Sequence, residues 1–204
     1  MHDYSIDRHP KEKIIFFLAY LAIASAPFLN DLGQQFVTFL EINTGWGLPP
    51  FIAIPILGLF FLIYQLFDKH LWKIRSFRKL LLVPDLNGQW VCSGNTTLKD
   101  GNQVSIDWNG EVTITQSWSK ILVHLKTESS HSKSISACLF HEVGVGYKLL
   151  YEYESNPSAN QHELKKHAGS AEILFAEDCK TGEGHYFTDQ HRQTVGMLSL
   201  RRKK

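Results

Sequence analysis

Two uncharged apolar segments near the N-terminus constrain this chain more than any other feature of its sequence. The first, IIFFLAYLAIASAPFL, covers residues 14–29, and the second, GLPPFIAIPILGLFFLIYQLF, covers residues 47–67. A helix that crosses a bilayer needs about 20 mostly apolar residues. The second segment has that length, and the first reaches it when extended slightly, which places Asn30 and Asp31 at the headgroup boundary. The sequence therefore predicts two transmembrane helices, at residues 14–32 and 47–67.

The prolines of the second segment predict where its helix starts and bends. Pro49 and Pro50 suit the first turn of a helix, where the amide hydrogens have no partner within the helix. Pro55 lies inside the segment and is expected to kink the helix, which a membrane tolerates when neighbouring groups satisfy the freed carbonyl.

Positive charge flanks the two segments on one side only. Between residues 30 and 46 there is no lysine or arginine. Because cytoplasmic loops carry an excess of these residues, both termini are predicted to lie in the cytoplasm. Residues 1–13 are then a cytoplasmic tail, residues 33–46 a short external loop, and Trp46 and Trp72 interfacial anchors. The basic flanking residues are Arg8, Lys11 and Lys13 before the first segment and Lys69, Lys73, Arg75, Arg78 and Lys79 after the second.

A secretory signal peptide is the alternative for the first segment. It has a basic start, a short apolar run and the small residues Ala24-Ser25-Ala26, which resemble a cleavage site. Pro27 would directly follow the cut, which weighs against this alternative. In both cases the second segment and its basic flank keep the C-terminal part of the chain inside.

Residues 68–84 are basic and amphipathic. The sequence DKHLWKIRSFRKLLLV is expected to continue the second helix and to lie along the anionic leaflet, where each cation contributes about 1 kcal/mol. The alternative is a plain flank that stops translocation. Pro84 ends the segment, because proline cannot continue a helix.

The pattern changes to a period of two after Pro84. In VSIDWNGEVTI, residues 104–114, apolar side chains alternate with polar ones, and Gly110 interrupts the apolar series where a long strand bends or bulges. Seven further runs show related patterns, with turn residues between them. They are residues 88–94, 120–126, 134–140, 147–154, 170–177, 184–189 and 194–201.

Residues 85–204 are therefore predicted to form an all-β domain, a small antiparallel barrel of about eight strands. A barrel is favoured over a sandwich because closure removes edges that would otherwise pair with other chains. The interior of such a barrel has room for side chains or for one small ligand. The polar stretch at residues 155–169 is expected to be a loop over one mouth.

Signatures of catalysis and of metal binding are missing. The chain has no GxxxxGK[ST], GxSxG or HExxH motif, so we predict no catalytic residue, no cofactor and no enzyme activity. The ten histidines match no zinc spacing and are expected to be mostly solvated, so no metal site is predicted. Cys92, Cys138 and Cys179 lack CxxC spacing and are expected to be free thiols. A net charge of +1 gives no case for binding DNA or RNA polymers.

Aromatic and cationic side chains are the candidates for ligand binding. The alternation in YKLLYEYE directs Tyr147, Tyr151 and Tyr153 inward, where they either pack the core or form a wall for stacking rings. The segment GHYFTDQHRQTVG is predicted to supply the last two strands and the mouth of a pocket. There Arg192 is either solvated or a clamp for phosphate, which its planar fork binds in a bidentate manner.

In this order the motifs resemble a known family. Two apolar spans, a basic segment and DLNGQW at the start of a small β domain resemble the two-transmembrane, β-strand-rich effectors of bacterial cyclic-oligonucleotide antiphage systems, which are CD-NTase-associated membrane proteins. The tip Asp189-Gln190-His191 departs from the family pattern. The resemblance is carried by Leu86-x-Gly88-x-Trp90, Tyr151-x-Tyr153, Asn156-Pro157, His167-x-Gly169, Tyr186-Phe187-Thr188, Arg192, Thr194 and Gly196.

The resemblance implies an effector in the bacterial inner membrane whose cytoplasmic barrel binds a cyclic dinucleotide, forms a homo-oligomer and disrupts the bilayer. In this view aromatic rings stack on bases, Arg192 meets phosphate, and threonine hydroxyls contact phosphate or base edges. Two alternatives stay open from the residues alone: a lipocalin-like barrel that binds an apolar molecule, and a membrane scaffold with a filled barrel. The predicted ligand-binding residues are Trp90, Tyr151, Tyr153, Tyr186, Thr188, Arg192 and Thr194.

Overall fold

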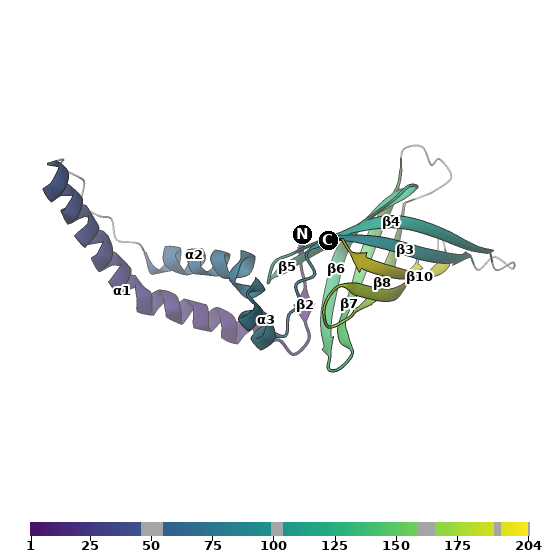
Figure 1. Ribbon diagram of the computed structural model, residues 1–204, viewed down its shortest axis with the longest axis horizontal. Coiled ribbons are helices and arrows are strands. Elements are labelled where there is room, and N and C mark those ends of the chain that lie inside the picture. The colour runs from purple at the N-terminus through teal and green to yellow at the C-terminus, as the bar shows by residue number, and fades with distance from the viewer. Residues whose placement is uncertain (46–54, 99–103, 159–165, 190–192, 204) are drawn as a thin grey trace. The chain divides into compact units, whose positions relative to one another are not determined.

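The computed structural model describes residues 1–45, 55–98, 104–158, 166–189 and 193–203 (Figure 1). These residues form two compact units. A helical unit covers Pro10–Trp72, and a β unit combines Met1–His9 with Lys73–Lys204.

Helix α1, Lys11–Thr44, is the longest element of the helical unit. It runs through Pro27 and ends at Gly45, whose positive φ of 67° and N–H bond to the Glu41 carbonyl form a left-handed cap. The prediction that the first helix ends at residue 32 and a loop follows is therefore wrong for residues 33–44. The lack of positive charge in this stretch predicts on which side of the membrane it lies, and not its backbone conformation. The helix continues until Gly45, which adopts the left-handed conformation that ends it.

Helix α2, Ile56–Lys69, starts directly after Pro55. Pro55 has φ −65° and ψ 141°, an extended conformation at the N-cap, so the predicted kink inside the helix is corrected to a helix start. The reason is that a proline ring has no N–H to give to a helix and clashes with the preceding turn. Pro49, Pro50 and Trp46 lie outside the described residues.

The two helices pack through small side chains and leave apolar faces outward. Ala22 and Ala26 of α1 meet Leu59 of α2, and Leu29, Phe60 and Ile63 pack against this cluster. Small residues one turn apart let helix backbones approach closely in lipid. Large apolar side chains cover the outer faces, where a soluble helix would carry polar ones. They include Phe16, Phe17, Phe28, Phe36, Phe39, Ile42, Leu57, Phe61, Leu62 and Leu66.

Only part of the two-span prediction is supported by the described helices. Helix α1 has 34 residues with a hydropathy of 1.7 in its most apolar window, which is long and apolar enough for a span. At 1.5 Å per residue it rises about 51 Å, more than the roughly 30 Å of a hydrocarbon core. Helix α2 has 14 residues, about 21 Å at the same rise, which is shorter than a span.

The basic segment at residues 68–84 does not continue α2 as expected. Helix α2 ends at Lys69, a short 3₁₀ helix η1 covers Leu71–Lys73, and helix α3 covers Arg75–Leu81. The extended backbone of Ile74 separates the last two. Trp72, predicted as an interfacial anchor, is fully buried, and burial of such a large apolar ring outweighs the weak preference for a continuous helix.

The β unit is a closed antiparallel barrel of eight strands, β3 to β10, as the sequence predicts (Figure 1). Each strand pairs with the next along the chain, β10 pairs with β3, and β5 with β6 completes the circle. The strands are β3 Gly88–Leu98, β4 Val104–Gln116, β5 Lys120–Thr127, β6 Ser130–Glu142, β7 Gly146–Pro157, β8 His167–Phe175, β9 Thr181–Thr188 and β10 Thr194–Arg202.

The seam between β5 and β6 is filled by the N-terminal residues. These strands pair with each other only near their shared turn, from His124↔Lys133 to Lys126↔His131. Farther along, β1, His2–Asp3, pairs with β5, and β2, Ser5–Ile6, pairs in parallel with β6. Residues 1–9 are thus part of the barrel wall and not a free tail. Each strand is only two residues long, so the sequence carries no period that could have indicated it.

Side chains anchor this N-terminal segment. Tyr4 is buried, and its hydroxyl accepts a hydrogen bond of 3.1 Å from the Gln116 side-chain amide. The Trp118 indole N–H donates to Nε2 of His9 at 3.0 Å. Because the segment closes the seam, a fragment that begins at Pro84 would lack two strands of the wall.

One end of the barrel interior is filled. Trp90 is fully buried there, with its ring 5.1 Å from that of Phe175 and its N–H donating to the Leu86 carbonyl. The Arg202 guanidinium lies 5.4 Å from the Trp90 ring centre and donates to the Asp85 carbonyl. The remaining large, fully buried side chains of this core include Leu149, Ile173, Ile114, Ile121, Val123 and Leu139.

Candidate functional site

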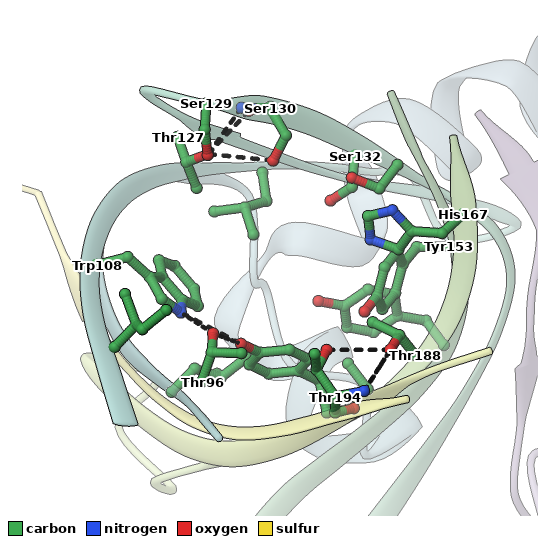
Figure 2. A pocket seen from close by; sticks show the side chains of 17 residues that line it. Thr96, Trp108, Thr127, Ser129, Ser130, Ser132, Tyr153, His167, Thr188 and Thr194 are labelled. Carbon is green, nitrogen blue, oxygen red and sulfur yellow. Dashed lines mark hydrogen bonds between the residues drawn. The ribbon is translucent and has the colours of Figure 1, made fainter. Parts of the chain in front are cut away.

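The other end of the barrel interior is hollow. A cavity of about 190 Å³ is lined by side chains from all eight barrel strands (Figure 2). Among the described residues that line it there is no aspartate, glutamate, lysine or arginine. The lining is aromatic and hydroxyl-rich: Thr96, Ile106, Trp108, Leu125, Thr127, Ser129, Ser130, Ser132, Tyr151, Tyr153, Ser155, His167, Ala171, Tyr186, Thr188, Thr194 and Leu198.

The structure brings five of the seven predicted ligand-binding residues to this cavity. They are Tyr151, Tyr153, Tyr186, Thr188 and Thr194. The alternation of β7, β9 and β10 directs them inward, which the sequence predicts for Tyr151 and Tyr153.

The two other predicted residues are not brought to the cavity. Trp90 points inward but lies at the filled end, packed on Phe175 and Arg202. Its fully buried ring has no surface left for a ligand, so we interpret it as a core residue. Arg192 lies outside the described residues.

Three of the cavity's aromatic rings each lie across a glycine on the neighbouring strand. Trp108 is paired with Gly94, Tyr153 with Gly169, and Tyr186 with Gly196. A Cβ atom at Gly169 would lie 2.5 Å from both the Tyr153 hydroxyl and the Phe187 carbonyl oxygen. One at Gly196 would lie 2.5 Å from the Tyr186 ring and still closer to the Asn95 carbonyl oxygen. Real Cβ atoms do not approach other atoms so closely. The glycines therefore let the rings lie back against the wall, which leaves the cavity open.

Hydrogen bonds fix two of these rings. The Trp108 indole N–H donates to the Thr96 hydroxyl at 3.0 Å and to the Tyr186 hydroxyl at 3.2 Å. The hydroxyls of Thr96 and Tyr186 also bond to each other. Figure 2 shows this network at one side of the cavity. The planes of the two rings are inclined by 66°, so each ring separately offers a preformed face for stacking at the cavity wall.

Thr188 and Thr194 hold the ends of β9 and β10 together. Their hydroxyls lie 3.0 Å apart, and the Thr194 N–H donates to the Thr188 hydroxyl at 2.9 Å (Figure 2). The Asp189 carboxylate accepts from the Ala168 N–H at 2.9 Å, which ties this turn to β8. The two predicted threonines thus have a structural role in this hairpin in addition to facing the cavity.

Burial keeps the Tyr151 phenol and the buried thiols of Cys92 and Cys179 protonated. Desolvation raises the pKa of Tyr151 far above its ordinary value, and the neighbouring Tyr153 and Cys92 add to the effect. Burial also raises the pKa of Cys92 to about 12 and that of Cys179 to about 11. All three cysteines are free, as expected.

Several polar residues that line the cavity were not predicted from the sequence, and Ser155 and His167 are the clearest examples. Both were assigned to a loop at residues 155–169, but β7 extends to Pro157 and β8 begins at His167. The signal was present for Ser155, because it continues the alternation of Tyr151 and Tyr153. The further missed lining residues are Thr96, Trp108, Thr127, Ser130 and Ser132.

No three histidine, cysteine, aspartate or glutamate side chains converge in the part of the chain that the structure describes. His167, which was expected in a solvated loop, is instead buried at the cavity wall.

Comparisons with known proteins agree with this division into a helical and a β unit. A family model described as "Cap15, cyclic dinucleotide receptor domain" matches residues 81–202, and one described as "Cap15, TM helices" matches residues 12–73. The chain is also similar to "CD-NTase-associated protein 15" of Yersinia aleksiciae, with 37% identity over 186 residues, which cover 91% of this chain and 86% of that protein. The chain therefore belongs to the Cap15 family of CD-NTase-associated proteins.

Proposed function

We propose that this protein is an antiphage effector that binds a cyclic dinucleotide in its barrel, self-associates and disrupts the bacterial inner membrane. The observation that carries the proposal is the cavity lined by aromatic rings and hydroxyls, which lies inside the domain that matches the receptor model. No catalytic step is part of this function.

The lining suits a ligand with aromatic bases and phosphodiesters. The ring of Trp108 or that of Tyr186 provides a face on which a base can stack, which is worth about 1–3 kcal/mol per base. Serine and threonine hydroxyls donate hydrogen bonds to phosphate oxygens, and the described lining has no carboxylate to repel them. Arg192 remains our candidate for a phosphate clamp at the mouth.

The size of the cavity supports insertion of one half of the ligand. An apolar cavity of about 150 Å³ holds a single benzene ring, so 190 Å³ suits one base and not two nucleotides. We infer that one base enters the barrel, and that the other half of the ligand stays at the mouth. There it would be available to a second copy of the protein.

The helical unit supports a membrane role. Its outward faces carry large apolar side chains, and α1 is long enough to span a bilayer. The charge asymmetry of the sequence supports a multi-pass arrangement in the inner membrane with both termini in the cytoplasm. In that arrangement the barrel meets its ligand on the side where nucleotides are made.

Ligand-driven assembly has an energetic requirement. A shift from 1:99 to 99:1 in favour of the associated state needs about 5.5 kcal/mol of differential binding. One stacked base and hydrogen bonds to one phosphodiester are of that order. Confinement to the membrane raises the effective concentration of the barrels and lowers the free energy that each contact between them must supply.

The two alternatives fit the cavity less well. A scaffold with a filled barrel would have no cavity of this size, and a receptor for an apolar molecule would have an aliphatic lining in place of the hydroxyls.

The test is a calorimetric titration of the full-length protein in phospholipid nanodiscs, because an isolated barrel fragment would lack β1 and β2. The ligands are cyclic di-AMP, cyclic di-GMP, cyclic GMP-AMP and cyclic UMP-AMP. We expect at least one to bind, and Tyr186→Ala to weaken that binding by about 10-fold to 100-fold through loss of stacking. Phe187→Ala is the matched control, because Phe187 is the next residue of β9 and lies 51% exposed on the outer face.

Membrane disruption is tested separately. The protein is reconstituted into phosphatidylethanolamine–phosphatidylglycerol vesicles that contain a self-quenched dye, and we expect the bound cyclic dinucleotide to trigger dye release. Absence of binding by all four ligands would overturn the receptor function. Binding without dye release would overturn only the membrane-disrupting function.

A further inference from the structure

A row of three buried polar side chains crosses one wall of the cavity. Ser132 of β6 is paired with Ser155 of β7, and Ser155 is paired with His167 of β8. Their exposed fractions are 8%, 4% and 9%, and all three side chains line the cavity. Figure 2 labels Ser132 and His167 at the wall, away from Trp108.

The two serines of this row differ from Ser134, a third buried serine, which lies on β6. Within the described residues, neither the Ser132 hydroxyl nor the Ser155 hydroxyl has a hydrogen-bond partner. By contrast, the Ser134 hydroxyl, two residues along β6, bonds to His2 at 2.7 Å and accepts from the Val123 N–H at 2.9 Å. Neither oxygen is among the enclosed, unpartnered side-chain atoms of the described residues, so both hydroxyls open onto the cavity, where a ligand can accept their hydrogen bonds.

The surroundings of the row favour an anionic ligand group of low charge. The described cavity lining has no carboxylate, so hydroxyl donors can approach an anion without repulsion. It also has no lysine or arginine. The nearby Lys166 lies largely in solvent, in an ion pair of 2.8 Å with Glu154. Hydroxyls beside an imidazole suit the single negative charge of a phosphodiester better than the double charge of a terminal phosphate.

We propose that the Ser132–Ser155–His167 row is a phosphodiester subsite, in which the two serine hydroxyls donate hydrogen bonds to the non-bridging oxygens of one phosphodiester of the bound cyclic dinucleotide. This assignment rests on the proposed function. The base of the same nucleotide then stacks on the ring of Trp108 or of Tyr186. The row discriminates against ligands whose phosphate is terminal and doubly charged.

The experiment compares Ser132→Ala, Ser155→Ala and the double variant with the native full-length protein in nanodiscs. Each is titrated with the member of the panel above that the native protein binds most tightly. We expect each single substitution to weaken binding about tenfold and the double substitution about 100-fold, as for hydrogen bonds to a charged group. Ser93→Ala is the matched control, because the Ser93 hydroxyl is exposed and bonds to Ser199 on the outer face.

Two further readouts separate a ligand-binding role from a structural one. The substitutions are expected to leave the melting temperature of the ligand-free protein unchanged or to raise it, because alanine removes a hydroxyl that had no partner. With an analogue whose phosphodiesters are replaced by uncharged methylphosphonates, the effect of the substitutions on affinity is expected to fall below threefold.

The outcomes are distinct. If the native protein binds no member of the panel, the proposed function fails, and this inference fails with it. If the native protein binds and the double variant behaves like Ser93→Ala, only the phosphodiester subsite is overturned. Equal weakening with the natural ligand and with the methylphosphonate analogue would also overturn it, since the serines would then contact base or ribose.

Discussion

The substitution Gly94→Ala tests whether the cavity depends on rings that lie back against glycines. Gly94 faces Trp108 directly across β3 and β4. A Cβ atom at this position would meet three atoms of the Trp108 ring, and the farthest of the three would still be only 2.7 Å away. Carbon atoms in contact prefer about 3.5–4.0 Å, so the indole ring must move by at least about 1 Å. The three nearest atoms all belong to that side chain, so the closest clash of the methyl group is with the ring.

The displaced ring would move into the cavity and leave its partners. The bonds from its N–H to Thr96 and Tyr186, at 3.0 Å and 3.2 Å, would be lost or distorted. We expect Gly94→Ala to weaken cyclic dinucleotide binding at least tenfold and to lower the free energy of unfolding by about 1–3 kcal/mol, as overpacking does. Calorimetric titration and chemical denaturation of the full-length protein measure the two effects.

A double-mutant cycle tests whether the Trp108 ring causes the effect of Gly94→Ala. In the background Trp108→Ala, the ring is gone, so Gly94→Ala should change stability by less than about 0.5 kcal/mol. If the glycine substitution destabilises both backgrounds equally, its effect comes from the backbone, and the account of the glycine–ring pair is wrong. Native-like ligand binding by Gly94→Ala would refute it as well.

Three further predictions concern other parts of the β unit. Tyr4→Phe removes the hydrogen bond from Gln116 and should lower the free energy of unfolding by about 1 kcal/mol in denaturant titrations; no change would mean that the N-terminal strands do not hold the seam. Trp90→Phe places a smaller ring in the core, so it should lower the free energy of unfolding and leave the dissociation constant of the ligand unchanged. If the fully folded variant binds the ligand more weakly, Trp90 is part of the binding site after all. At pH 8 only about 1 in 10,000 Cys92 thiols is ionised, because its pKa is raised to about 12. Iodoacetamide should therefore modify the half-buried Cys138 first and Cys92 only after unfolding, which mass spectrometry of digested protein would detect.

Local sequence patterns were sufficient to predict the β domain and the alternating direction of side chains along its strands. The period of two in each run predicted strands, and it correctly directed Tyr151 and Tyr153 inward. Closure into a barrel followed from the number of strands and the need to remove sheet edges. The apolar segments likewise predicted helices, although a lack of charge did not reveal that α1 continues to Thr44.

How deep a side chain lies along the barrel could not be predicted from the sequence. Trp90 and Tyr186 both point inward, yet Trp90 packs in the filled end and Tyr186 lines the cavity. Alternation fixes only the face of a strand, whereas depth depends on the register between strands and on the tilt that closes the barrel.

Sequence by itself determined the alternation of side chains along each strand, because the direction of a side chain is a property of the strand. Only the tertiary structure decided which of them meet. Ser132, Ser155 and His167 come from three strands and become neighbours through the register of two strand pairs. Residues 1–9 join β5 and β6 across more than a hundred residues of sequence. Such contacts form because closing the barrel satisfies backbone groups at its seam, and no local pattern encodes that requirement.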